Sequence, residues 1–362
     1  MAAKRASGGV DLDAPDSFKR VDKQDLLGRV EHFADDLEEA ARGARKSAPG
    51  FRKGGRYVSS VVVAGMGGSA IAGEIAADVF RASLSVPMTV CQEYVLPAFA
   101  RRETLVIVSS YSGGTEETLA MFEDALHRGC RVVGVTSGGT LGARLKEAGL
   151  PEFSLPTGIQ PRAALPFLLA PVMETLERVE LASAGAQLEE AVRVTREVAK
   201  ACGRGRPTRT NRAKKIAEAV AGSTPVIYGH GILRAAAMRW RTQINENPKR
   251  LARDDVFPAS NHNDINAWGA DPRARNFQAI LLRDPKEHPR IRKRIELTRK
   301  LAFKGNAGGI HEVEAQGETA LARALSTVLV GDFASVYLAL KLGVDPSPVS
   351  VITKLKEELA KP

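Results

Sequence analysis

Short apolar runs alternate with amphipathic stretches between residues 58 and 155 of this 362-residue chain. A strand covered on both faces is apolar throughout, so these runs predict buried strands. The strands are expected at 58–64, 86–92, 104–109, 131–136 and 152–155. Helices are expected to begin near Ser69, Thr115 and Thr140. Strands that alternate with helices predict a parallel sheet with helices on both faces.

The alternation returns in the second half of the chain. An amphipathic pattern over 22–46 predicts one helix before the first sheet, and 161–202 predicts long helices without strands. The later elements are expected to be a strand at 224–228, a turn at 229–231, a helix over 233–244, a strand at 277–282, and helices over 318–342 and 346–360.

These patterns predict an α/β chain of two doubly wound parallel-sheet domains in tandem. A chain of this length favours two hydrophobic cores over one. The expected limits are 1–202 for the first domain with its helical extensions, 203–212 for a linker, and 213–362 for the second domain with its C-terminal helices. Each domain has a glycine-rich turn after its first strand, GMGGSAIAG at 65–73 and GHGILRAA at 229–236, which indicates a weak internal duplication.

A second turn in the first domain, SYSGGTEET at 110–118, joins the expected strand at 104–109 to a helix. Ser110, Ser112 and Thr115 supply three hydroxyls there. The first backbone N–H groups of a helix have no partner within the helix and lie at the positive end of its dipole. Such a place suits a phosphate, so the sequence predicts a phosphorylated small molecule as substrate.

The Gly65 turn alone is compatible with a different ligand. Gly65-x-Gly67-x-x-Ala70 also fits the fingerprint of dinucleotide-binding folds, and an NAD-binding dehydrogenase stays a less favoured alternative. A dehydrogenase has no need of a second hydroxyl-rich turn after the third strand. Two such turns can converge on one phosphate where the strand order reverses.

Charge and cysteine content exclude several other classes of function. The net charge is +10, but the basic stretches 204–215 and 290–300 contain no aromatic residue. A solvated linker and an amphipathic surface helix are expected there, not a nucleic-acid interface. No uninterrupted apolar run approaches the roughly 18–20 residues of a membrane span, and no secretory signal is expected. Three scattered cysteines and no His-Glu-x-x-His predict a reduced, cytoplasmic protein without metal or cofactor.

The two turns of the first domain and several later strings resemble one enzyme family. GMGGSAIAG and SYSGGTEET are similar to turns of sugar isomerase (SIS) domains, and the chain from about residue 10 resembles the bifunctional phosphoglucose/phosphomannose isomerases, which carry two SIS domains. The other similar strings are EYVLP at 93–97, VTSGG at 135–139, QPRAAL at 160–165, NENPK at 245–249, NHNDI at 261–265 and DPSPVSVITKLKEEL at 345–359. The resemblance implies an isomerase that interconverts glucose 6-phosphate or mannose 6-phosphate with fructose 6-phosphate.

The resemblance also implies which residues bind the substrate. The phosphate would be held by Ser110, Ser112 and Thr115, and the sugar would be lined by Gly67, Gly68 and Ser69. Arg162 would offset the charge of a cis-enediolate intermediate. A cation just after Pro161, near an expected helix start, is unfavourable for the helix dipole, which favours a functional role over a structural one.

The proton-transferring residues implied by the resemblance lie in the second domain. Glu246 would move a proton between C1 and C2, and its place at a helix C-terminus is electrostatically unfavourable. His262 would help to open the sugar ring, and in the family it reaches the site of the neighbouring subunit, which implies a homodimer with shared active sites. A buried lysine would complete the set, Lys356 aligning better than Lys354.

The sequence departs from the family pattern at three places. Gly114 stands where the family's SYSGNTEET has asparagine, Ser260 follows Ala259 where a glutamate is usual before NHNE, and Asp264 replaces the glutamate of NHNE. The relative activity on the two aldoses therefore stays open. The remaining alternative is a non-catalytic SIS-type sensor of sugar phosphates, although no DNA-binding segment is expected ahead of residue 22.

Overall fold

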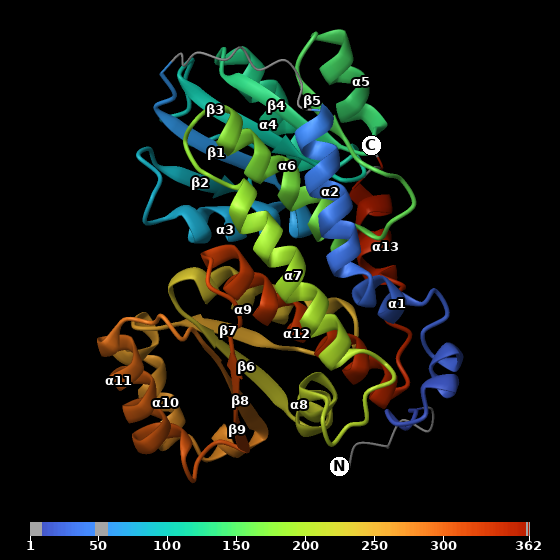
Figure 1. Ribbon diagram of the computed structural model, residues 1–362, viewed down its shortest axis with the longest axis vertical. Coiled ribbons are helices and arrows are strands. Elements are labelled where there is room, and N and C mark those ends of the chain that lie inside the picture. Colours follow the sequence, from blue (N-terminus) through green and yellow to red (C-terminus); the bar gives the residue numbers. More distant parts are fainter. Residues whose placement is uncertain (1–8, 48–56, 360, 362) are drawn as a thin grey trace. The chain divides into compact units, whose positions relative to one another are not determined.

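The computed structural model describes residues 9–47, 57–359 and 361, and its contacts divide them into two compact units (Figure 1). Unit N takes His32–Arg196 and Gln316–Ser326. Unit C takes the residues up to Glu31, Glu197–Ala315, and those from Thr327 on. The sequence analysis predicted that each domain is one continuous stretch of the chain, whereas each unit is built from two or more separate segments. The predicted linker 203–212 lies inside unit C.

Unit N is built around a five-stranded parallel sheet of order β2-β1-β3-β4-β5. Its strands are β1 (Ser60–Gly65), β2 (Met88–Cys91), β3 (Thr104–Ser109), β4 (Arg131–Thr136) and β5 (Glu152–Ser154). They confirm the five predicted strands, with ends shifted by up to two residues. Every residue of β1 and β3 is buried, as expected for central strands covered on both faces.

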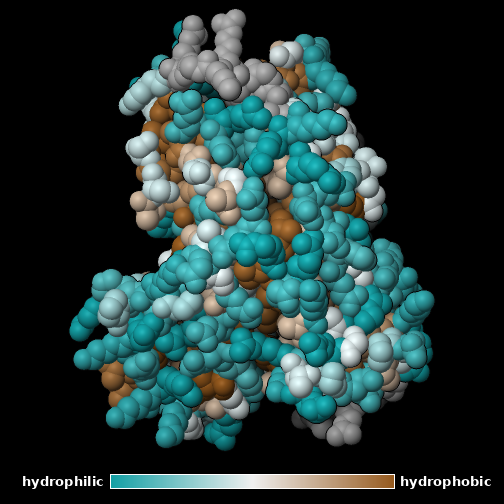
Figure 2. All heavy atoms as spheres, viewed as in Figure 1, coloured by the Kyte–Doolittle hydropathy of each residue, from teal (hydrophilic) through white to brown (hydrophobic). Residues whose placement is uncertain are grey.

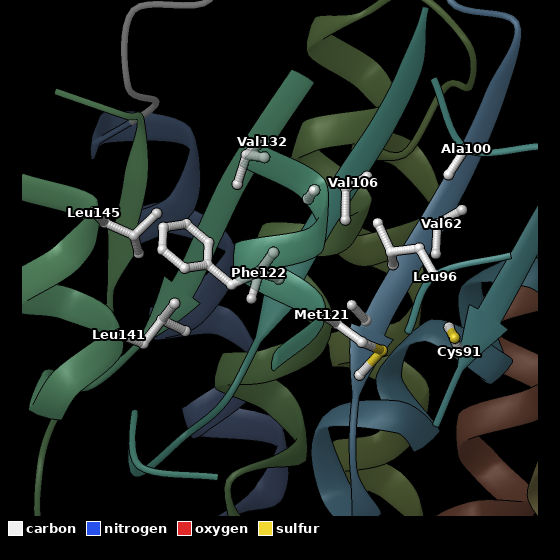
Figure 3. Close-up of a cluster of buried hydrophobic side chains, with 13 residues drawn as sticks. Val62, Cys91, Leu96, Ala100, Val106, Met121, Phe122, Val132, Leu141 and Leu145 are labelled. Carbon is white, nitrogen blue, oxygen red and sulfur yellow. The ribbon is translucent and has the colours of Figure 1, made fainter. Parts of the chain in front are cut away.

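The helices of unit N also follow the predicted order. They are α2 (Phe33–Ser47), α3 (Gly67–Phe80), α4 (Glu116–His127), α5 (Gly139–Glu147), the 3₁₀ turn η2 (Pro161–Ala163), α6 (Leu165–Arg178) and α7 (Gly185–Cys202), whose last residues belong to unit C. On one face of the sheet, Met121 and Phe122 of α4 pack with Val106 and Val132 of the strands and with Leu145 of α5 (Figure 3).

The prediction of one helix over 22–46 is wrong, because the structure has α1 (Leu26–Glu31) and then α2, with a turn at His32. Asp22 caps the start of α1, accepting from the N–H groups of Leu26 and Leu27 at 2.8 Å each. At the other end the Glu31 carboxylate accepts from Arg204 Nε at 2.7 Å. The apolar stripe continues across the break, so periodicity did not reveal it.

Unit C contains a four-stranded parallel sheet of order β7-β6-β8-β9. Its strands are β6 (Thr224–Gly229), β7 (Arg253–Val256), β8 (Phe277–Arg283) and β9 (Gly309–Glu314). The strands at 224–228 and 277–282 were predicted, whereas β7 and β9 were not. In order of appearance along the chain, the first four strands of the two sheets are arranged identically.

The remaining elements belong to unit C, except that α12 begins in unit N. They are η1 (Pro15–Arg20), α8 (Arg212–Val220), η3 (Gly231–Leu233), α9 (Arg234–Glu246), η4 (Ala259–His262), α10 (Asp264–Ala270), η5 (Pro272–Asn276), α11 (Pro289–Thr298), η6 (Arg299–Phe303), α12 (Ala320–Leu342) and α13 (Ser350–Leu359).

The two basic stretches differ in the structure. The expected surface helix at 290–300 is α11, and Figure 2 shows hydrophilic side chains over most of the visible face around α10 and α11. The expectation of a solvated segment at 204–215 is wrong for Lys214, which is only 1% exposed. Its ammonium group donates to the carbonyl oxygens of Leu12, Arg204 and Arg206 at 2.6, 3.0 and 2.7 Å. These bonds fix the segment to the rest of unit C.

Within the described ranges, one helix is long and apolar enough to cross a membrane, namely α12. Of its most apolar window, 89% is buried, as in the core helix of a globular unit. Polar residues such as Thr327 and Asp332 interrupt its apolar runs, and for that reason run length alone did not single it out.

Candidate functional site

Two turns of unit N meet at the carboxyl edge of its sheet. β1 and β3 are neighbours with Gly65 opposite Ser109, and the strand order reverses between them. A Cβ on Gly65 would lie 2.7 Å from the Ser109 carbonyl oxygen, so only glycine permits this approach. Open parallel sheets bind their ligands at such a reversal point. The turns at 65–69 and 110–115 thus lie where the sequence analysis placed them.

The three predicted phosphate-binding hydroxyls are organised within the second turn. Ser110 is 2% exposed, and its hydroxyl donates to Thr115 Oγ1 at 3.0 Å while accepting from the Gly113 N–H at 3.2 Å. Ser112 and Gly114 are exposed, and the Gly114 N–H points to Ser112 Oγ at 3.4 Å. No carboxylate occurs in the turn before Glu116, so nothing in it repels an anion.

A third turn, at 137–139, holds the hydroxyl turn in place. Gly113 has a φ of +68°, and a Cβ there would lie 1.8 Å from the Gly138 carbonyl oxygen. Ser137 donates from its hydroxyl to the Tyr111 carbonyl oxygen at 2.6 Å, and the Leu141 N–H donates to the Gly113 carbonyl oxygen at 2.8 Å. The sequence analysis missed this supporting role of VTSGG, for which adjacent glycines between a strand and a helix were the available signal.

The start of α3 approaches η2, which carries Arg162. Gly67 has a φ of +52°, and a Cβ on Gly68 would lie 2.8 Å from the Pro161 carbonyl oxygen and 3.7 Å from Arg162 Cα. Arg162 is only 7% exposed and Ser69 only 5%. The structure therefore brings Gly68, Ser69 and Arg162 to the same edge of the sheet as the hydroxyl turn.

Two hydroxyls beside the turn were not singled out by the sequence analysis. Ser109 ends β3 and Thr118 lies in the first turn of α4, and both are fully buried. Within the part of the chain that the structure describes, neither hydroxyl has a hydrogen-bond partner. A buried polar group without a partner costs about 1–3 kcal/mol, so the chain tolerates this cost next to its candidate site.

Glu246 is the last residue of α9 in unit C and is half-buried. Upstream in α9, Arg239 forms a buried ion pair with Asp332 of α12, with NH2 to Oδ2 at 2.8 Å.

Downstream, the Asn247 side-chain amide donates to Ser335 Oγ at 2.8 Å. The Lys249 ammonium donates to the carbonyl oxygens of Asn247, Asp345 and Pro346 at 3.0, 2.6 and 3.1 Å. The NENPK residues around Glu246 therefore fix the end of its helix.

His262 is exposed in η4, whereas the nearby Asp264 is buried in a polar network. The Asp264 carboxylate accepts from the Tyr228 hydroxyl, from Trp268 Nε1 at 3.0 Å and from the Arg253 guanidinium. Burial, together with the neighbouring Asp264, raises the pKa of Tyr228 far above its ordinary value. Asp264, one of the departures from the family pattern, is thus buried and accepts from three side chains.

Lys356 and Lys354 both lie in α13, which has no buried residue. The resemblance implied a buried lysine, and in the single chain neither candidate is covered. Their exposure does not distinguish them.

Among the described residues, no group of three or more His, Cys, Asp or Glu side chains could hold a metal ion. The three cysteines are unpaired, and burial raises the pKa of the Cys202 thiol to about 11.

Comparisons with known proteins place this chain in a family. A family model described as the bacterial phospho-glucose isomerase C-terminal SIS domain matches residues 209–359. The bifunctional phosphoglucose/phosphomannose isomerase of Aquifex aeolicus is 37% identical over 83% of this chain and 90% of its own length. The protein of the same name from Caldicellulosiruptor bescii is 35% identical over 84% of this chain and 90% of its own length.

A solved structure shows the same fold. The crystal structure of a glucose-6-phosphate isomerase like protein from Thermus thermophilus superposes with a TM-score of 0.60, covering 96% of this chain and 99% of that chain at 20% identity. The predicted α/β class with two parallel sheets is confirmed. With relatives at 35–37% identity over more than four fifths of its length, the chain belongs to the bifunctional phosphoglucose/phosphomannose isomerase family.

Proposed function

We propose that this protein is an aldose–ketose isomerase that converts glucose 6-phosphate and mannose 6-phosphate into fructose 6-phosphate. The observation that carries the proposal is the hydroxyl-lined turn at the strand-order reversal of unit N, with the buried Arg162 at the same edge. The names of the similar relatives support the same substrate class.

In this proposal the distal phosphate is held by Ser110, Ser112 and Thr115. The hydroxyl of Ser110, which donates to Thr115 in the structure, would turn to donate to a phosphate oxygen. A hydrogen bond to a charged group contributes about 1.5–3 kcal/mol, so two or three of them suffice to anchor the ligand. Gly67, Gly68 and Ser69 would line the sugar, because the start of α3 is open at Gly67, where a Cβ would meet nothing within 4 Å.

Glucose 6-phosphate and mannose 6-phosphate differ only in configuration at C2. Removal of the C2 proton from the open chain gives the same cis-enediolate from both, and protonation at C1 then gives fructose 6-phosphate. Glu246 would take the C2 proton and return it at C1, a role that typically contributes 10²–10⁴-fold. Arg162 would offset the negative charge of the enediolate, while His262 and Lys356 would serve ring opening and complete the catalytic set.

We also propose that the protein is a cytoplasmic homodimer that shares its active sites. Helix α13 supports a partner, because Val351, Ile352, Leu355 and Leu359 are 81, 43, 59 and 59% exposed in the single chain. Apolar side chains clustered on one helix are a usual feature of protein interfaces. Light scattering of the purified protein should give twice the chain mass, and a monomer for the wild type would contradict the proposal.

The test of function is a coupled isomerase assay with both aldose phosphates, run side by side. We expect the wild type to convert both, and to do so equally well after treatment with EDTA. If neither aldose is converted while fructose 6-phosphate still binds, the sensor alternative would replace this proposal. Thermal stabilisation by NAD but not by fructose 6-phosphate would favour the dehydrogenase.

A further inference from the structure

The reversal point of the sheet in unit C repeats the design of the one in unit N. The Gly229-His230-Gly231 turn follows β6, as the Gly65 turn follows β1. Tyr228 pairs with Leu281, which sets Gly229 opposite Leu282 in the same way that Gly65 is opposite Ser109. Counted from these paired positions, residues 110–115 lead to α4 at Glu116 and residues 283–288 lead to α11 at Pro289, although Arg283 is still the last residue of β8. The turn after β8 is therefore the counterpart of the hydroxyl turn.

A carboxylate fills this second turn. Counting from the equivalent strand positions, Glu287 stands where unit N has Gly114. The Glu287 side chain is 1% exposed, and its Oε1 accepts from Arg283 NH2 at 2.6 Å and from Arg292 Nε at 3.2 Å. On the other side, Oε2 lies 3.2 Å from His230 Nε2, which belongs to the first turn. The carboxylate is thus enclosed by both turns.

The groups around Glu287 suit an anion. His230 is 5% exposed, and its Nε2 approaches Glu287 without meeting the geometry of a hydrogen bond. Burial raises the pKa of Glu287, but the hydrogen bond and charge of Arg283, with help from Arg292 and His230, lower that pKa overall. An ionised carboxylate at this depth is stable only because donors and cations surround it.

We propose that unit C contains a second anion site, built like the phosphate turn of unit N, and that the carboxylate of Glu287 permanently occupies it. A phosphate dianion is the class of ligand that the site would take if Glu287 were removed. The protein then binds one substrate phosphate per chain although it has two equivalent turns.

The test replaces Glu287 and offers inorganic phosphate as the probe. Ser110→Ala and Ser112→Ala are present in every variant, so that the turn in unit N does not respond. We expect phosphate, compared with chloride at equal ionic strength, to raise the thermal unfolding midpoint of Glu287→Ala in a saturable way. In the chain that carries only Ser110→Ala and Ser112→Ala, phosphate should not raise the unfolding midpoint. Adding Arg292→Ala to Glu287→Ala should abolish the rise in midpoint caused by phosphate.

Glu312→Ala is the matched control, because Glu312 also pairs with Arg283, at 3.3 Å, but its side chain is 34% exposed. The proposal is overturned if Glu287→Ala shows no response to phosphate, or if Glu312→Ala responds equally. If Glu287→Ala does not fold on expression, its refolding yield decides: a higher yield in phosphate than in chloride supports the site, and equal yields overturn it. No turnover is measured, so the outcome is independent of the proposed isomerase activity.

Discussion

The same strand arrangement carries different chemistry in the two units. In unit N the turn after β3 presents the hydroxyls of Ser110, Ser112 and Thr115, and Ser112 is open to solvent. In unit C the corresponding turn leads from β8 to α11, but Glu287 fills it and is held by two arginines. By the proposed function, the first turn would bind an external anion, whereas the second contains the carboxylate of the chain's own Glu287.

This difference teaches that topology creates a place for a ligand but does not choose the ligand. A reversal of strand order leaves a crevice at the carboxyl edge of any such sheet. Whether the crevice binds a substrate depends on the few side chains in the turn, which is why function has to be argued from the site and not from the fold. By the proposed function, the hydroxyl turn would bind the phosphate and Glu246 would transfer the proton.

The largest expected effect comes from removing proton transfer by Glu246 without changing the residues proposed to bind the phosphate. Glu246→Gln keeps the shape of the side chain but cannot accept a proton, so kcat should fall about 10²–10⁴-fold with both aldoses. The affinity for fructose 6-phosphate, measured by calorimetry, should change little because, by the proposed function, the phosphate would be held in unit N. Glu218→Gln, at an exposed acid on α8, is the control and should retain full activity. Wild-type turnover by Glu246→Gln would refute the assignment.

The hydroxyl turn can be broken by adding a single methyl group. Gly113→Ala forces an L-residue into a positive φ and against the Gly138 carbonyl oxygen, which should destabilise the protein by about 1–3 kcal/mol and raise KM. Gly114→Ala is a matched control, since a Cβ there would meet nothing within 4 Å. Urea unfolding and the isomerase assay report the two effects. Equal behaviour of the two variants would show that the turn does not need its observed conformation.

A change in the turn of unit C should lower stability without affecting KM. Glu287→Gln removes the charge that pairs with Arg283 and Arg292, so the free energy of unfolding should fall by about 1–3 kcal/mol. KM for glucose 6-phosphate should stay at the wild-type value, because the proposed function assigns this turn no contact with the substrate. Urea unfolding and steady-state kinetics on one preparation measure both. A raised KM with unchanged stability would reverse the roles of the two turns.

The smallest expected effect is on pH dependence. Burial lowers the pKa of His230 below 6.5, although Glu287 and Asp284 oppose the change. As the pH falls below about 6.5, His230 therefore takes up its proton in the unfolded chain before it does so in the folded one. The free energy of unfolding decreases over this range and stops decreasing once the pH is below the folded-state pKa of His230. His230→Gln should make stability less dependent on pH across that window, as measured by urea midpoints at several pH values. An unchanged slope would show that His230 does not contribute.

The fold was largely predictable because its central strands are continuous apolar runs. β1, β3 and β4 are covered on both faces, so burial is visible in composition alone. β7, with sequence RDDV, is a half-exposed edge strand and carries no such signal. Lys214 was placed in a solvated linker because its three carbonyl partners lie in a segment distant in sequence and in the turn before α8.

The candidate site was predictable to the extent that its residues are neighbours in sequence. The hydroxyl turn lies within six consecutive residues, Ser110 to Thr115, and could be read directly. The Glu287 cluster draws on His230, Arg283 and Arg292 from separate elements, and only the pairing of β6 with β8 shows that they meet. The sequence analysis recognised the duplicated glycine turns, but it did not extend the duplication to the turns that follow β3 and β8.

The central claim is that each chain binds one sugar phosphate and binds it through the hydroxyl turn of unit N. Isothermal titration of fructose 6-phosphate into the wild type and into Ser110→Ala/Ser112→Ala tests it most directly. We predict one site per chain in the wild type and a loss of affinity of about 10-fold or more in the variant, since each lost bond to a charged group contributes about 1.5–3 kcal/mol. Two sites per chain, or unchanged affinity in the variant, would contradict the account.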